Sequence, residues 1–215
     1  AKVSHFYEKL YIGEDYAKGL VQVPFNNFQD VKLQKARYFK LDTTGNKVLI
    51  ENVKVKYADI KDYFVQNIFY TDLKVKQFNC SVDLPKNYLI NYKYDVIYKD
   101  LKFLSSFYFQ DINEGVEKVE ILIKKNVNID FSTFDLNCKE IEKTEDDTYI
   151  RFKGKNLKRF IPTKHSVSSS YYLPHIILSV KQSETIEKVI EILKSSDNIY
   201  SWYNSLIKEL KPDQE

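Results

Sequence analysis

Residues 83–124 read DLPKNYLINYKYDVIYKDLKFLSSFYFQDINEGVEKVEILIK and carry the clearest pattern in the chain. The even positions of one run are all aromatic or aliphatic, namely Tyr88, Ile90, Tyr92, Tyr94, Val96 and Tyr98. Because successive side chains of a strand point to opposite faces, this alternation predicts a long strand with one face on a hydrophobic core. A turn at Gly115 and an alternating run through Val119, Ile121 and Ile123 predict a second strand.

Shorter runs of the same kind lie on both sides of this stretch. One face of a predicted strand at residues 3–12 is formed by Val3, His5, Tyr7, Lys9 and Tyr11. A turn signal at residues 43–46 (TTGN) predicts a hairpin. Residues 58–70 are ambiguous, because Ile60, Tyr63, Phe64 and Asn67 suit a helical turn or two and residues 68–70 suit an extended exit. The serine-rich residues 156–172 predict a surface loop. Further strands are predicted at residues 20–25, 31–41, 47–57, 73–82, 127–134, 138–143, 148–153 and 175–181.

After residue 182 the apolar residues take helical spacing. Ser183 is a suitable N-cap for a first helix, whose apolar face would be formed by Ile186, Val189, Ile190 and Leu193. A second helix is predicted between Ser195 and Pro212, with an apolar stripe formed by Ile199, Trp202, Tyr203, Leu206 and Leu210. Many short strands followed by two helices predict a mainly β fold. We expect a β-sandwich domain of antiparallel strands at residues 1–182 and a helical tail with two C-terminal α-helices at residues 183–215.

Composition and charge argue against several classes of protein. The 215 residues include 33 basic and 30 acidic ones, a net charge of +3, and the two signs are interleaved, which argues against nucleic-acid binding. The 17 tyrosines and 14 phenylalanines favour a folded core over disorder. No apolar run reaches the roughly 20 residues of a transmembrane helix, and the start lacks the pattern of a signal peptide. Because the chain begins at Ala1 rather than at a methionine, we expect a processed form or a fragment.

No residue pattern predicts an enzyme. The sequence has three histidines, His5, His165 and His175, and no GxSxG motif to supply a serine nucleophile. Cys80 and Cys138 fall within strand-like runs rather than at a helix N-terminus, where a thiolate would be favoured. The sequence also lacks a glycine-rich phosphate loop and a close set of metal ligands. We therefore expect no catalytic residue, no metal and no cofactor.

Tyr171 and Tyr172, with His175 close by, form the best candidate for a ligand-binding site. The two tyrosines fall in the predicted loop, where aromatic side chains are exposed more easily than on strands, and they could bind a sugar or a peptide. The ladder from Tyr88 to Tyr98 could also form a binding platform. Six aligned apolar side chains are typical of a core, however, and we interpret the ladder and Trp202 as packed residues.

Cys80 and Cys138 allow two interpretations. They can be two separate buried thiols, because free cysteine behaves as a small hydrophobic residue. The alternative is one disulfide that joins two strands, which requires an oxidising compartment. Neither cysteine belongs to a CxxC pattern, so a structural zinc site is not expected.

The central stretch also carries a family resemblance. Residues 87–100, followed by LSSFYFQD at residues 104–111, resemble the uncharacterised β-rich domain that precedes a transglutaminase-like domain in many envelope proteins of Bacteroidetes-type bacteria. The segment YYLPHI at residues 171–176 is similar to the closing strand of that domain. The segment IYSWY at residues 199–203 is similar to the entry into the transglutaminase-like part. The resemblance covers most of the chain.

The resemblance implies a location and a partner. In such proteins the Cys-His-Asp machinery lies in the downstream domain, so the resemblance assigns no catalytic residue to this chain. It implies export to the periplasm or the outer envelope, which favours a bridge between Cys80 and Cys138. The function that it implies is a non-catalytic accessory domain that holds or presents substrate to the downstream domain of the same polypeptide. The alternative is an independent module that binds a glycan or a peptide.

Overall fold

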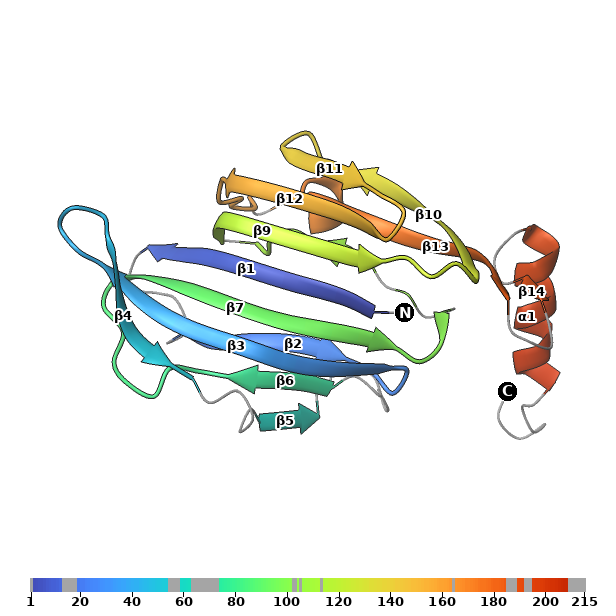
Figure 1. Cartoon of the computed structure of the whole chain (residues 1–215), viewed down its shortest axis with the longest axis horizontal. Helices are drawn as coiled ribbons and strands as arrows, with labels where there is room; N and C mark the ends of the chain where they lie inside the picture. Colours follow the sequence, from blue (N-terminus) through green and yellow to red (C-terminus); the bar gives the residue numbers. More distant parts are fainter. Residues whose placement is uncertain are drawn as a thin grey trace.

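The computed structural model of the chain describes residues 2–12, 19–53, 59–62, 74–101, 104, 106–112, 114–163, 165–184, 189–191 and 195–208. This part of the chain consists mainly of antiparallel strands in three sheets, with one α-helix near the C-terminus (Figure 1). The mainly β, sandwich-like fold predicted from the sequence is therefore confirmed. Of the predicted elements, residues 54–57 and 73 and most of residues 58–70 lie outside the described residues.

The largest sheet has seven strands in the order β11-β12-β9-β1-β7-β3-β4. Its strands are β1 (Lys2–Ile12), β3 (Gln29–Leu41), β4 (Lys47–Asn52), β7 (Asn87–Tyr98), β9 (Gly115–Lys124), β11 (Ile141–Glu145) and β12 (Tyr149–Leu157). β1 lies at the centre and pairs with β7 on one side and with β9 on the other. The strand predicted at residues 88–98 is thus β7, which lies next to the central strand of the large sheet.

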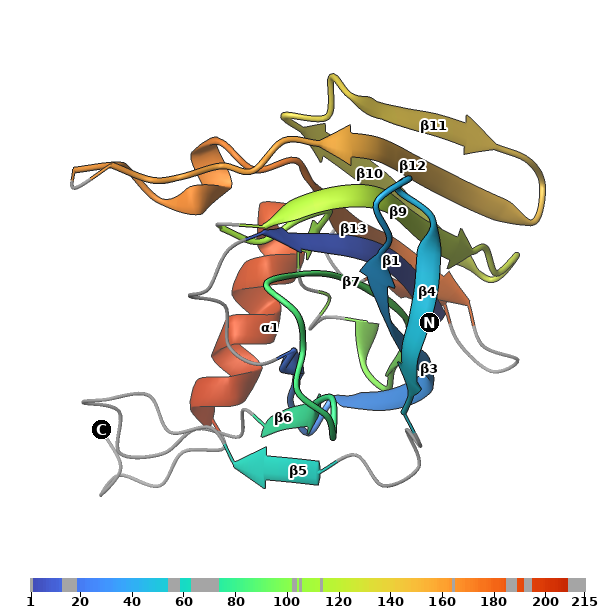
Figure 2. The ribbon, with the colours of Figure 1, turned by 90° about the vertical axis from the view of Figure 1, so that its left-hand side faces the viewer.

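Two smaller sheets cover one face of the large sheet, which curves around them (Figure 2). The first consists of β2 (Val21–Phe25), β6 (Lys74–Phe78) and β5 (Asp59–Asp62), in that order. The second consists of β8 (Phe107–Tyr108), β10 (Ile129–Leu136), β13 (His175–Glu184) and β14 (Val189–Glu191). Phe78 of the first sheet and Phe107 of the second meet the rings of Tyr92 and Tyr98 edge-on, so both small sheets pack on the same face of β7.

The core follows the alternation of the sequence. The even residues of β7 and the odd residues of β1 face the small sheets, and most of them are buried. The opposite face of the same strands is mixed, since it contains buried Leu89 and also two ion pairs, Glu8 with the ammonium of Lys47 at 2.5 Å and Asp95 with Lys2 at 2.8 Å. The interpretation of the tyrosine ladder as core is therefore confirmed for most of its members.

The prediction of a first helix at residues 183–193 is wrong for residues 183–184 and 189–191, which are the part of this segment that the structure describes. β13 runs on to Glu184 and pairs with β14, so that Gln182 lies opposite Glu191 and Glu184 opposite Val189. The helical spacing of the apolar residues is a local signal, and the hydrogen bonds between two strands outweigh it here. The sheet also continues past residue 182, where we predicted the change from sandwich to helical tail.

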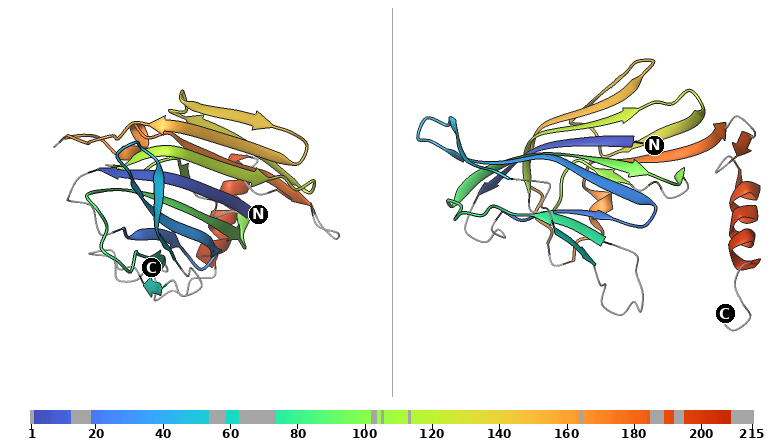
Figure 3. Two further views of the ribbon diagram at one scale, coloured as in Figure 1. Left: turned by 60° about the vertical axis from the view of Figure 1, so that its left-hand side comes forward. Right: turned by 60° about the horizontal axis from the view of Figure 1, so that its bottom comes forward.

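The second predicted helix is present as α1 (Ser196–Lys208). Ser195 caps it, because the Asn198 N–H donates to the Ser195 hydroxyl at 3.3 Å and the Ser195 N–H donates to the Asn198 side chain at 3.1 Å. α1 lies beyond the end of β13, next to β14 and away from the large sheet (Figure 1 and Figure 3). Trp202, which we expected to be packed, is half-buried, and Ile199 and Tyr203 of the same predicted stripe are exposed.

Gly19 is a position where the fold requires glycine. Its φ of +71° lies in the left-handed region, and a Cβ there would come within 2.5 Å of Leu84 Cδ1 and 2.7 Å of Tyr38 Cε1. We expect Gly19→Ala to lower the free energy of unfolding, measured by urea denaturation, by about 2–3 kcal/mol through backbone strain and crowding. Gly45→Ala is the control, because Gly45 has a φ of +84° but nothing within 4 Å, and it should cost only about 1 kcal/mol. Equal losses in the two variants would contradict the crowding argument.

Candidate functional site

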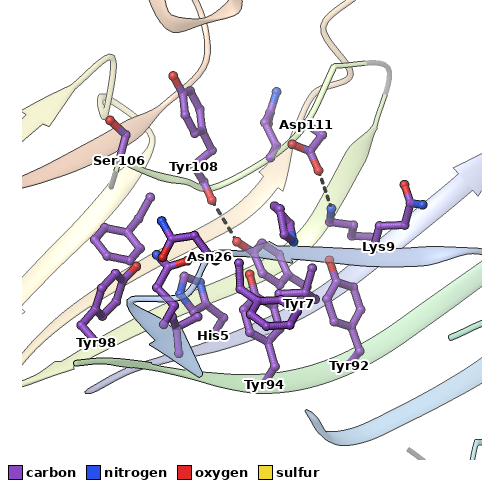
Figure 4. A pocket seen from close by; sticks show the side chains of 18 residues that line it. His5, Tyr7, Lys9, Asn26, Tyr92, Tyr94, Tyr98, Ser106, Tyr108 and Asp111 are labelled. Carbon is purple, nitrogen blue, oxygen red and sulfur yellow. Dashed lines mark hydrogen bonds and ion pairs between the residues drawn. The ribbon is translucent and has the colours of Figure 1, made fainter. Parts of the chain in front are cut away.

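A cavity of about 320 Å³ lies between the two small sheets, on the inner face of the large one. Its floor is formed by β1 and β7, and its walls by β2 and by residues 106–111 around β8 (Figure 4). We call this cavity the aromatic cleft. The residues that line it are His5, Tyr7, Lys9, Gln22, Val23, Pro24, Phe25, Asn26, Gln29, Tyr92, Tyr94, Val96, Tyr98, Ser106, Phe107, Tyr108, Gln110 and Asp111. A neighbouring hollow of about 410 Å³ shares several of these residues and extends the cleft towards Glu114.

The floor of the cleft is a ladder of stacked rings that follows from the pairing of β1 with β7. His5 lies opposite Tyr94 and Tyr7 opposite Tyr92. The ring centroids of these pairs are 4.6 and 5.2 Å apart, with nearly parallel planes. Figure 4 shows the ring of Tyr92 rising from β7 with its hydroxyl away from the strand. Because the ring faces cover one another, a molecule in the cleft meets the ring edges, with their hydroxyls and imidazole nitrogens.

His5 is the most unusual residue of the floor. Its side chain is buried, with the residue 4% exposed, and neither ring nitrogen has a hydrogen-bond partner among the described residues. Burial lowers the pKa of His5 from 6.5 to about 3, against the opposing effect of Asp95, so the ring is neutral at physiological pH. A neutral imidazole has one donor and one acceptor, and buried polar groups of this kind are normally paired. His5 therefore offers two unused hydrogen-bonding positions in the cleft.

Lys9 lies at the boundary between the cleft and the neighbouring hollow. It is also 4% exposed, and its ammonium forms ion pairs with Glu114 and, at 3.4 Å, with Asp111. The ammonium lies 4.9 Å from the centroid of the Tyr7 ring, within reach of a cation–π contact. Burial opposes the charge, but Glu114 and Asp111 outweigh that effect and hold the pKa of Lys9 above its ordinary value. Lys9 is therefore charged at neutral pH, and two carboxylates pair with it.

The tyrosines of the floor are neutral. Burial is the main cause that raises the pKa of Tyr7, Tyr92 and Tyr94 above the ordinary tyrosine value. The Tyr7 hydroxyl donates to the carbonyl oxygen of Tyr108 at 2.9 Å and so links β1 to the wall at β8. A histidine with a pKa near 3 is a weak general base at neutral pH. The chemistry of the cleft therefore suits hydrogen bonding to a neutral polar molecule better than proton transfer.

The structure separates the three residues of the site predicted at residues 171–175. Tyr171 ends the short 3₁₀-helix η3 (Ser169–Tyr171) and is 71% exposed, and exposed Tyr172 stacks on Phe160. His175 instead is buried, with its Nδ1 atom 2.9 Å from the Leu173 carbonyl oxygen. Its ring stacks on Tyr108, a wall residue of the aromatic cleft. The strand pairing of β13 therefore turns His175 into the molecule, away from the surface that the two tyrosines share.

The two cysteines are separate free thiols in the structure. The Cys80 thiol donates to the carboxylate of Glu51 at 3.0 Å, and the Cys138 thiol lies 3.4 Å from the His175 carbonyl oxygen. Burial raises the pKa of both thiols to about 11, with smaller contributions from Glu51 to Cys80 and from Asp135 to Cys138. Both are therefore protonated at neutral pH and poor nucleophiles. Neither cysteine lines the aromatic cleft.

The residues that distinguish the cleft, His5 and Lys9, were missing from the site predicted from the sequence. Their signal was present, because both occupy odd positions of β1 between Val3, Tyr7 and Tyr11, on the face assigned to the core. A titratable side chain on an otherwise apolar strand face must be paired, neutral or functional.

Neither a protein-family model, nor a curated protein, nor a solved structure matches the chain. Within the described ranges, no helix is long and apolar enough to cross a membrane. Three or more histidine, cysteine, aspartate or glutamate side chains placed to hold a metal ion are likewise not found among the residues described above.

Proposed function

We propose that the chain is a non-catalytic binding module that holds a neutral, hydrogen-bonding part of a glycan or peptide in the aromatic cleft. The observation that carries this proposal is the unpaired, buried imidazole of His5 at the floor of a cavity. An unpaired buried polar group typically costs about 1–3 kcal/mol of stability. A ligand that supplies the missing partners would recover that free energy on binding.

The charges around the cleft favour a neutral ligand. The Lys9 ammonium is paired with the carboxylates of Glu114 and Asp111, so it is not free to bind an anionic ligand, and the tyrosines and His5 are uncharged. Sugar hydroxyls and peptide amides each offer donors and acceptors that match tyrosine hydroxyls and a neutral imidazole. The volume of about 320 Å³ lies at the lower end of the range of about 300–1,000 Å³ for small-molecule sites, so one ring or one side chain with its amide is a suitable size.

The proposal predicts which substitutions change binding. We would screen a panel of disaccharides and short uncharged peptides by isothermal titration, and we expect His5→Phe to weaken the best binder by about tenfold or more, because two hydrogen bonds are lost. Tyr171→Ala and Tyr172→Ala should leave that affinity unchanged, because these side chains lie outside the cleft. The opposite pattern, with normal binding by His5→Phe and weak binding by the two alanine variants, would place the site on the exposed surface of residues 171–172 instead.

A second candidate function follows from the family resemblance. We propose that the module presents its ligand to a transglutaminase-like domain of the same polypeptide, in the periplasm or the outer envelope. The exposed apolar residues Ile199, Tyr200 and Tyr203 on α1 support this proposal, because α1 is the segment that resembles the entry into such a domain. An antibody raised against this chain should then detect a band far above 25.5 kDa in the envelope fraction of the source cells. A band near 25.5 kDa would remove the accessory-domain proposal and leave the independent module.

A further inference from the structure

A larger and more apolar cavity opens at the end of the sandwich where β1 begins and β9 ends. Its volume is about 680 Å³, and we call it the end pocket. The large sheet supplies Val3 and Ile123 to its wall, and the second small sheet supplies Phe131, Leu178 and Val180. The end pocket and the aromatic cleft share none of the described lining residues.

The interior of the end pocket consists of aliphatic and aromatic side chains. Val3, Ile123, Leu178 and Val180 are buried and belong to the faces of the two layers that meet in the core. The cavity is therefore a part of the space between the layers that the side chains of the sandwich leave open towards solvent. Val127, which also lines the end pocket, is 99% exposed.

The mouth of the end pocket is positively charged. Lys2, Lys124 and Lys125 line it, and the other described residues that line it include no acidic side chain. Lys2 is bound to Asp95 at 2.8 Å and Lys125 to Glu145 at 2.6 Å. Lys124 is exposed and forms no ion pair with any residue that the structure describes. An anion at the mouth would therefore meet one ammonium that no described carboxylate compensates, that of Lys124, and two ammoniums that already bind carboxylates.

We propose that the end pocket binds one monomeric anionic amphiphile of the fatty-acid type. The acyl chain would lie between the layers against Val3, Leu178 and Val180, and the carboxylate would lie at the mouth beside Lys124. An apolar cavity and a cationic rim together match the two ends of such a molecule, and a neutral polar ligand of the kind proposed for the aromatic cleft matches neither. The inference is independent of the proposed function, because the two sites differ in residues and in chemistry.

The test is a titration of the whole chain with three probes of equal chain length, each below its micelle concentration: dodecanoate, dodecanol and dodecyltrimethylammonium. We expect saturable binding of one dodecanoate per chain. We expect dodecanoate to bind about tenfold or more tightly than dodecyltrimethylammonium, because of the lysines. Within a series of carboxylates, each additional methylene that fits should tighten binding by about fourfold, up to the length of the cavity.

Two variants test whether the binding of dodecanoate depends on the charge at the mouth or is non-specific adsorption. Lys124→Glu should weaken dodecanoate about tenfold and reduce the preference over the cationic probe. Lys153→Glu is the matched control, because Lys153 is an exposed lysine of β12 outside the end pocket. This variant should change neither the affinity for dodecanoate nor the preference for dodecanoate over the cationic probe.

Other results would overturn the proposal. Unsaturable uptake of dodecanoate, or equal affinity for the anionic and cationic probes, would show that the mouth does not select an anion. Sedimentation of the chain with phosphatidylglycerol vesicles, without binding of monomeric dodecanoate, would assign the lysines to a membrane surface instead. A loss of binding in Lys153→Glu as large as in Lys124→Glu would also contradict the assigned mouth.

Discussion

Replacing His5 by phenylalanine is expected to make the protein more stable while it weakens ligand binding. Phenylalanine retains a ring to stack on Tyr94 and has no polar atom to bury. At neutral pH the free energy of unfolding should increase by about 1–3 kcal/mol, the typical cost of an unsatisfied buried polar group. A substitution that raises stability and removes binding is the behaviour expected of a residue retained for function.

The difference in the free energy of unfolding between His5→Phe and the wild-type chain should increase as the pH falls. The unfolded chain binds a proton on His5 below an ordinary pKa of 6.5, whereas the folded chain, with a pKa of about 3, does not bind it until much lower pH. Protons therefore favour the unfolded state throughout this window, and the wild-type chain loses stability from His5 by up to about 1.4 kcal/mol for each pH unit. Between about pH 7 and pH 5, the advantage of His5→Phe should grow by about 2 kcal/mol.

Urea denaturation of both proteins across this pH range checks the prediction. The carboxylates that also titrate in acid, such as Glu8 and Asp95, are the same in the two chains, so the difference between the curves isolates His5. A constant difference between about pH 7 and pH 5 would mean that His5 ionises normally in the folded protein. The buried, neutral imidazole on which the proposed function rests would then be excluded.

Lys9→Met is expected to be the most destabilising of the substitutions considered. Methionine fills most of the space of the lysine stem, but it leaves the Glu114 carboxylate with the Tyr11 hydroxyl and without its cation. Removal of one partner from a buried ion pair typically costs about 3–5 kcal/mol, because the remaining charge is uncompensated. We expect a loss of that size in the free energy of unfolding.

Two further variants test the cause of this loss. Glu114→Gln in the Lys9→Met background should restore about half or more of the loss, since it removes the unpaired charge. Lys143→Met breaks a partly exposed pair with Asp135, whose closest atoms are 3.3 Å apart, and should cost less than about 1 kcal/mol. If the double variant were no more stable than Lys9→Met, lost packing rather than lost charge pairing would be the cause.

The strands of the large sheet could be predicted because their signal is local. In β1 and β7 the alternation of apolar and polar residues has a period of two, and it sets which face each side chain joins. The helix at residues 183–193 could not be excluded in the same way. Val189 and Ile190 fit a helical face, and only the pairing of β14 with β13, a contact between segments, decides against it.

The aromatic cleft was predictable only in part. The face shared by His5, Tyr7 and Lys9 follows from their odd positions in β1. The opening above that face depends on how far β2 and β8 approach each other across the sandwich, and neither segment carries a local signal for that distance. For the same reason the loop tyrosines Tyr171 and Tyr172 could be placed at the surface, whereas the burial of His175 against Tyr108 could not be foreseen.

The second layer of the sandwich is divided into two sheets that have no strand in common. The aromatic cleft lies at the seam between them, and none of the backbone ladders described above crosses that seam. One small sheet can therefore slide slightly over the large sheet and widen the access to the cleft, while the hydrogen bonds between the strands of each sheet stay intact. The barrier to ligand entry is then set by side-chain contacts such as the hydrogen bond from the Tyr7 hydroxyl to the Tyr108 carbonyl oxygen. The rate at which a ligand enters and leaves the cleft can therefore change without any change in the fold.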